Sequence, residues 1–240
     1  MSALPIVTAM ELDAAWLAPT WFIDSDHADV ADFARTTVGT AADPVDRAVA
    51  LFHAVRDGIR YDPYNVAYER HAFRASVVVH SRSNWCVPKS VLLAASARHL
   101  GIPARLGFAD VRNHLTSEKL SATMGTDLFA WHGYAELLLP DPTGAAGDLR
   151  WFKLSTAFNI ELCDRFGVKV LEFDGTADAL MHPYDQAGNR HMEYVRQRGS
   201  YDDVPFEQIL ADFAEIYGTT FGEIAHAGSA EVAGDDTFAG

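Results

Sequence analysis

The sequence predicts an α+β fold, and three observations lead to this prediction. Segments with helical spacing of apolar residues come first along the chain. A longer and largely apolar helical segment lies in the middle, and two strand-like runs separated by turn residues follow it. Because helices and strands are grouped rather than strictly alternating, the order favours α+β over a parallel α/β sheet.

The first part of the chain is expected to hold strands and then a short helix. Residues 4–24 mix Ile, Val, Leu, Trp and Phe and predict one or two strands. The stretch 25–39 predicts a helix that Ser25 or Asp26 can cap, with acidic residues in its first turn. Gly39 is the predicted end of that helix.

A second helix is predicted immediately afterwards. Asp43 is a good N-cap, and Pro44 suits the first helical position. The apolar residues that then share one helical face are Val45, Ala48, Val49, Phe52 and Val55. Gly58 should end this helix, and residues 58–63 should be extended.

The central helix is predicted to begin at Cys86 or Val87, with Pro88 in its first turn. Its apolar positions mark it as largely buried, and they include Val91, Leu92, Ala95 and Leu100. Gly101 and Pro103 end it, and residues 104–112 predict a strand.

Two further strands are predicted to form an antiparallel hairpin. They cover residues 129–140 and 149–158, with Asp, Pro and Gly residues between them, and the polar stretch 113–128 reads as a loop. The stretch 205–218 predicts an amphipathic helix. We expect one domain over residues 1–227, with its core at about 45–160, and a disordered tail over 228–240.

Composition restricts the partners and the compartment. The net charge is −14 without blocks of Lys or Arg, so neither nucleic acid nor an anionic membrane is expected as a partner. The two cysteines form no CxxC pattern, and neither a metal nor a cofactor is expected. The first 25 residues lack a basic start and contain Glu11 and Asp13, which argues against a signal peptide and predicts a cytoplasmic protein.

Cys86 is the first candidate for chemistry. The unpaired N–H groups at a helix N-terminus favour a thiolate, so this position predicts a lowered thiol pKa and a stronger nucleophile. The alternative is a small buried hydrophobic residue, which is the commoner role of a free cysteine. His132 opens a predicted strand downstream and is the candidate base, because a thiol–imidazole pair needs spatial rather than sequential adjacency.

These residues lie in segments that resemble a known family. The run WCVPKSVLLAASARHLGIPARLGFADV, and HLGIPAR at residues 99–105 above all, is similar to the nucleophile helix and following strand of transglutaminase-like proteins. WHGYAELLL resembles the family's histidine strand, and LRWFKLS resembles the strand after it. The chain as a whole resembles bacterial transglutaminase-like proteins described as cysteine proteases.

The resemblance implies a papain-like core, in which the nucleophile helix packs on an antiparallel sheet. It also implies acyl transfer at an amide of a peptide or another small amide, with Cys86 attacking and His132 moving the proton. A thioester would form, and water or an amine would resolve it. Hydrolysis, transamidation and other thiol chemistry all stay open, as does the oligomeric state.

One position departs from the family pattern. The family has an aspartate that orients the histidine, and Ser155 stands in its place here. The predicted hairpin places Ser155 roughly opposite His132, where a hydroxyl can accept a hydrogen bond from the imidazole but cannot stabilise imidazolium as a carboxylate does. Thr156, Asn159, a carboxylate from elsewhere, or no residue at all are the alternatives. The rival function is therefore a catalytically weak binding or scaffold module.

An oxyanion hole is expected to use the backbone N–H of Cys86 and a side chain from just upstream. Asn84, Trp85 and His80 are candidates, although Asn84 could instead cap the helix. Trp85 and Trp131 flank the pair and could form walls of a substrate groove or pack in the core. A loop with His182, Asp185 and His191 matches no tight metal motif.

Overall fold

The computed structural model describes residues 13–114 and 124–218. The described helices are α1 (Ala28–Val38), α2 (Pro44–Gly58), α3 (Ala75–Val78), α4 (Cys86–His99), α6 (Ile160–Phe166) and α7 (Phe206–Tyr217), with short 3-10 helices at Ala14–Trp16 and Arg70–Phe73. The described strands are β1 (Arg60–Tyr61), β2 (Ser83–Asn84), β3 (Ala104–Asn113), β4 (Leu128–Pro140), β5 (Leu149–Leu154) and β6 (Met192–Tyr201).

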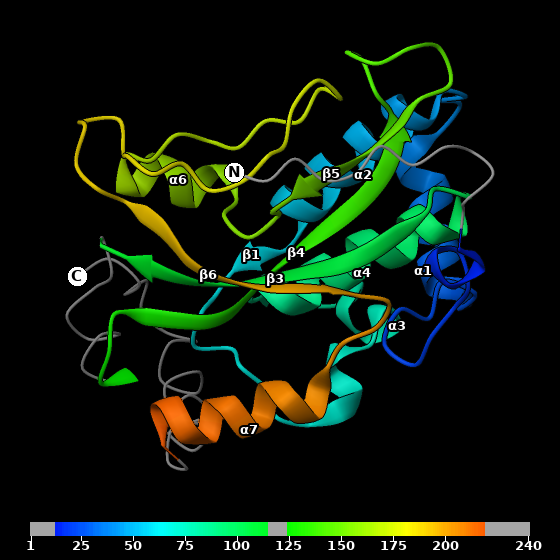
Figure 1. Ribbon diagram of the computed structural model, residues 1–240. Helices are drawn as coiled ribbons and strands as arrows, with labels where there is room; N and C mark the ends of the chain where they lie inside the picture. The colour runs from blue at the N-terminus through cyan, green and yellow to red at the C-terminus, as the bar shows by residue number, and fades with distance from the viewer. Residues whose placement is uncertain (1–12, 115–123, 219–240) are drawn as a thin grey trace.

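The larger sheet has four strands in the order β5-β4-β3-β6, and all three pairings are antiparallel. Helix α4 packs against β3 and β4, and α1, α2 and α3 pack around α4 (Figure 1). The two-residue strands β1 and β2 pair in parallel just before α4 begins. The α+β fold, with a central helix on an antiparallel sheet, is confirmed.

Helix α4 lies in the centre of the core. Each of its residues from Cys86 to Arg98 is buried, and such a helix needs apolar or small residues on all of its faces. Gly133 of β4 permits close contact with its first turn. A Cβ at Gly133 would lie 2.9 Å from Val87 Cγ2 and 3.1 Å from Val87 Cα. The strand therefore passes directly beside the helix end that carries Cys86.

Several details differ from the sequence predictions. Residues 13–24 contain a 3-10 helix rather than a strand, while residues 1–12 lie outside the described residues. His27 caps α1 in place of Ser25 or Asp26, because its Nδ1 accepts from Asp29 N–H at 3.3 Å. The stretch 160–200 holds α6 and most of β6, and the tail 228–240 also lies outside the described residues.

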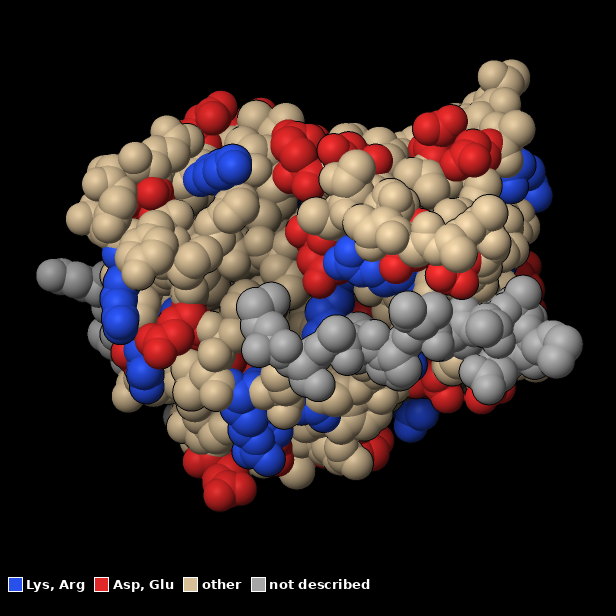
Figure 2. Space-filling model, turned by 45° about the horizontal axis from the view of Figure 1, so that its top comes forward, with Lys and Arg blue, Asp and Glu red and all other residues tan. Residues whose placement is uncertain are grey.

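The surface carries both signs of charge. On the face in Figure 2, Lys and Arg side chains stand in small groups close to Asp and Glu, and uncharged surface separates these groups. Over the described ranges, each helix is too short or too polar to cross a bilayer.

Candidate functional site

Cys86 and His132 line one cavity of about 50 Å³ beside the N-terminus of α4. Both are buried, with 6% and 5% of their surface exposed. Helix α4 supplies the thiol, and β4 supplies the imidazole from the strand that Gly133 holds against that helix. The aromatic side chains of Trp85, Phe129 and Phe213 also line the cavity. The fold therefore brings together the two residues that the sequence singles out.

The Cys86 thiol sits among backbone donors but away from water. Gly133 N–H points at Sγ from 3.5 Å, and the N–H groups of Cys86 and Val87 also favour the thiolate. Burial outweighs these donors and raises the pKa of the thiol to about 11. This is the opposite of the shift that the helix N-terminus alone predicts, because desolvation penalises the charged form more than the donors stabilise it.

His132 is equally secluded. Burial lowers the pKa of its imidazole to about 4. The ring of Tyr194 meets the imidazole edge to face, with 6.2 Å between the ring centroids. Between the pKa of the imidazole and that of the thiol, the resting pair is therefore a neutral thiol and a neutral imidazole rather than an ion pair.

A β-bulge determines which residues of β4 face the cavity. Ala109 of β3 pairs with His132 and Val111 pairs with Phe129, so β4 carries one extra residue between them. Trp131 takes up that residue with a φ of 58°, an uncommon value for a large side chain. Asp110 supports the bulge by accepting from Trp131 N–H at 3.1 Å.

The indole of Trp131 belongs to this support and does not line the cavity. Its Nε1 donates to Asp212 at 2.9 Å, and the Arg198 guanidinium lies over its ring. Arg198 also pairs with Asp110 and Asp212. Of the two alternatives for Trp131, a wall of the groove or packing in the core, the structure shows packing in the core.

Ser155, which stands where the family pattern has an aspartate, lies beside His132. Its Oγ lies 3.5 Å from His132 Nε2, at the long limit of a hydrogen bond. Leu154 pairs with Ala135, so Ser155 lies diagonally across from His132 rather than directly opposite it. Among the described residues, no carboxylate forms an ion pair with His132.

The two alternatives to Ser155 have other surroundings. Thr156 Oγ1 is buried without a hydrogen-bond partner among the described residues. Asn159 Oδ1 accepts from Tyr61 N–H at 3.1 Å, so it holds the segment after β5 against β1. Of the three candidates, Ser155 is the one whose hydroxyl lies within hydrogen-bond distance of the imidazole.

The three upstream candidates for the oxyanion hole, Asn84, Trp85 and His80, lie in different surroundings. Trp85 lines the cavity and also belongs to the hydrophobic core. His80 is exposed and pairs with Asp29 at 2.8 Å, away from the cavity, so its assignment is corrected. Asn84 lines a different hollow, and its Oδ1 accepts from Trp85 N–H at 3.0 Å rather than capping α4. The remaining donors at the thiol are the backbone N–H groups of the helix end and of Gly133.

Sequence reasoning missed Lys89, which lies one helical turn after Cys86 and is fully buried. Its ammonium donates to Arg56 O at 2.9 Å, to Ala157 O at 3.0 Å and to Ile59 O. Burial lowers its pKa to about 7. Lys89 thereby joins the end of α2, the start of β1 and the segment after Ser155. Its position three residues after Cys86, on the same face of a helix expected to be buried, was the feature of the sequence that could have indicated a buried lysine beside the site.

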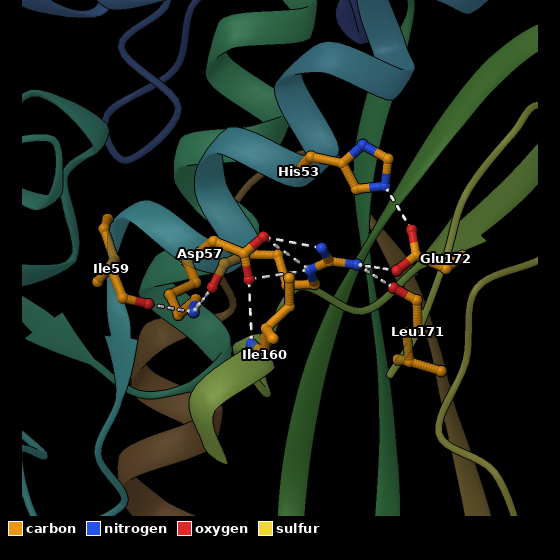
Figure 3. A network of polar contacts seen from close by, with 8 residues as sticks. His53, Asp57, Ile59, Ile160, Leu171 and Glu172 are labelled. Carbon is orange, nitrogen blue, oxygen red and sulfur yellow. Dashed lines mark hydrogen bonds and ion pairs between the residues drawn. The ribbon is translucent and has the colours of Figure 1, made fainter. Parts of the chain in front are cut away.

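A second polar network continues from there, and Figure 3 shows its members together. The buried Arg56 guanidinium lies between Asp57 and Glu172, at 2.7 and 3.1 Å. Asp57 accepts from Ile160 N–H at 3.1 Å, and Glu172 pairs with His53 at 2.9 Å. These contacts fasten the start of α6 and the segment around Glu172 to the end of α2.

No described group of three or more His, Cys, Asp or Glu side chains is arranged to hold a metal ion. In the loop that includes His182, Asp185 accepts from Asn189 N–H at 2.7 Å. His191 is buried and stacks on Phe158, with 5.9 Å between the ring centroids. These contacts are those of a polar loop packed on the domain.

Comparisons with known proteins place this site in a family. A search among curated proteins gave no match. A solved structure from Cytophaga hutchinsonii, named a putative cysteine protease, aligns with a TM-score of 0.45 and 16% identity. The alignment covers 81% of this chain and 57% of that one, so this chain spans less than two thirds of that protein. The model of the transglutaminase-like superfamily matches residues 31–156, which include Cys86, His132 and Ser155. The chain belongs to the transglutaminase-like superfamily.

Proposed function

We propose that the chain is a cysteine hydrolase or peptidase that forms a thioester on Cys86 from an amide of a peptide-like substrate. The observation that carries the proposal is the shared cavity of Cys86 and His132, with Gly133 N–H directed at the sulfur. Family membership supports cysteine-dependent chemistry in general. Water is the default acceptor for the thioester, and an amine would give transamidation.

The steps follow from the neutral pair. The Cys86 sulfur attacks the carbonyl carbon while His132 accepts the thiol proton, so charge develops only as the C–S bond forms. The oxyanion can accept from backbone N–H groups at the helix end. The C–N bond then breaks as imidazolium gives its proton to the leaving amine. Water, deprotonated by His132, attacks the thioester, and the proton returns to the departing sulfur.

Ser155 has a positioning role in this scheme. A proton on His132 Nε2 can be donated to Ser155 Oγ, which leaves the other ring nitrogen as the base. A hydroxyl supplies less stabilisation of imidazolium than a carboxylate would. We therefore expect slow turnover. Activated esters should acylate Cys86 without a protonated leaving group, so their acyl-enzyme should accumulate because its hydrolysis still needs His132 as the base.

The proposal is tested by intact-protein mass spectrometry after incubation with p-nitrophenyl esters and peptide anilides. We expect a single acyl adduct in the wild type and in Cys163→Ala, and none in Cys86→Ala. Cys163 is a matched control because it is also buried, and burial raises its pKa to about 11 as well. Adducts that persist in Cys86→Ala, or a complete lack of adducts in the wild type, would favour the binding-module alternative.

A further inference from the structure

The walls of the cavity beside Cys86 are of one chemical kind. Aromatic and aliphatic side chains make up most of the lining, among them Val111, Met124, Phe129, Phe158, Met192 and Phe213. Apart from the reacting pair, the lining residues with polar side-chain atoms are Asn113, Trp85, Tyr61 and Tyr217. Within the described parts of the chain, no Lys, Arg, Asp or Glu lines this cavity.

The size of the cavity sets a limit on what it holds. Its volume of about 50 Å³ is roughly a third of the ~150 Å³ of an apolar cavity that accepts benzene. A short aliphatic chain fits such a space, whereas a planar aromatic ring requires the lining to move. Met192 is 5% exposed and lies at the border between this cavity and a separate outer hollow that Met181 also lines.

We propose that this cavity binds a short, uncharged aliphatic acyl group, whose carbonyl carbon reacts with Cys86. The proposal rests on the proposed function and names its substrate class. A charged acyl group would lose its hydration without gaining a partner, which is strongly unfavourable. The net charge of −14 attracts cations toward the molecule as a whole. The overall field therefore favours binding of a cationic group, whereas the apolar lining of the cavity opposes it.

Alkyl methanethiosulfonates test the cavity without any turnover, because they react with an accessible thiol and displace a sulfinate. The reagents are the neutral butyl, the anionic sulfonatoethyl and the cationic trimethylammonioethyl compounds, used on Cys163→Ala so that only Cys86 is modified. Rates are divided by those of free cysteine. We expect the neutral reagent to be at least about tenfold faster than either charged reagent. A cationic reagent as fast as the butyl compound would overturn the proposal.

An ester series then tests the acyl group itself. Two added CH₂ groups predict that p-nitrophenyl butyrate acylates Cys86 about tenfold faster than the acetate, at ~0.8 kcal/mol for each CH₂ buried. The phenylacetate and hemisuccinate esters should react slowly. Met192→Ala should admit the phenylacetate, whereas Met181→Ala, the same substitution outside the cavity, should not.

The two proposals fail in different ways. If no ester acylates Cys86, the proposed function fails, and the thiosulfonate rates still decide whether the cavity prefers an uncharged alkyl group. If acetate, butyrate and hemisuccinate acylate Cys86 equally, the thioester chemistry stands and the acyl preference is overturned.

Discussion

Replacing Lys89 by Met tests whether the buried ammonium holds the site together. Met keeps an unbranched side chain but removes donors from the carbonyls of Arg56, Ile59 and Ala157. Each buried carbonyl left without its donor costs about 1–3 kcal/mol, so the three together cost about 3–9 kcal/mol. Relief from burying an ammonium, whose pKa burial lowers from 10.5 to about 7, offsets up to ~5 kcal/mol of this cost. We expect the free energy of unfolding to fall by about 2–3 kcal/mol, because the unsatisfied carbonyls outweigh that relief.

The assay is urea unfolding followed by tryptophan fluorescence, together with thermal unfolding. For a chain of this size the loss corresponds to a midpoint lower by about 4–12 °C. Lys169→Met is the control, because Lys169 is exposed and should change stability by less than about 0.5 kcal/mol. An unchanged or raised urea midpoint for Lys89→Met would contradict this expectation, since it would mean that the ammonium costs more to bury than its three hydrogen bonds return.

Three further outcomes follow from the site. Because burial lowers the pKa of His132 from 6.5 to about 4, the unfolded state binds more protons in that interval. The free energy of unfolding should therefore fall by up to ~3 kcal/mol as pH drops from 6.5 to about 4. Urea unfolding of the wild type and of His132→Gln at several pH values measures this dependence, which should be weaker in the variant. The rate of iodoacetamide alkylation of Cys86 should climb with pH toward about 11, and a plateau already present at neutral pH would contradict the neutral pair. Gly133→Ala places a Cβ 2.9 Å from Val87 Cγ2 and should cost about 1–3 kcal/mol and slow acylation of Cys86. Gly58→Ala, where a Cβ meets nothing within 4 Å, should do neither.

Local signals made much of the fold predictable. Asp43 caps α2 by accepting from Val45 N–H at 2.8 Å, as an aspartate before Pro44 predicts. The start of α4 at Cys86 was also readable, since Pro88 restricts the first turn. Such features depend on a few consecutive residues. By contrast, His27 caps α1 although the residue types favour Ser25 or Asp26.

The Cys86–His132 pair was predictable from the sequence, whereas buried Lys89 and the electrostatics of the site were not. A helix N-terminus lowers a thiol pKa, and that effect is local to the sequence around Cys86. The opposing desolvation comes from side chains such as Phe158 and Phe213, which lie far along the chain and meet only in the folded protein. No motif states how deeply a cysteine will be buried. The sign of the net shift was therefore beyond sequence reasoning, although the Cys86–His132 juxtaposition was not.

Burial away from water explains together the neutral Cys86–His132 pair, the serine at position 155 and the apolar lining of the cavity. In a site that lowers the imidazole pKa to about 4, a buried carboxylate at position 155 would favour imidazolium and, with it, a resting thiolate. Ser155 supplies a hydrogen-bond partner without that charge, so in the proposed reaction the thiol would stay protonated until a carbonyl is in place. An uncharged acyl chain fits the same condition, because it displaces water from the cavity without bringing a charge that the lining cannot pair.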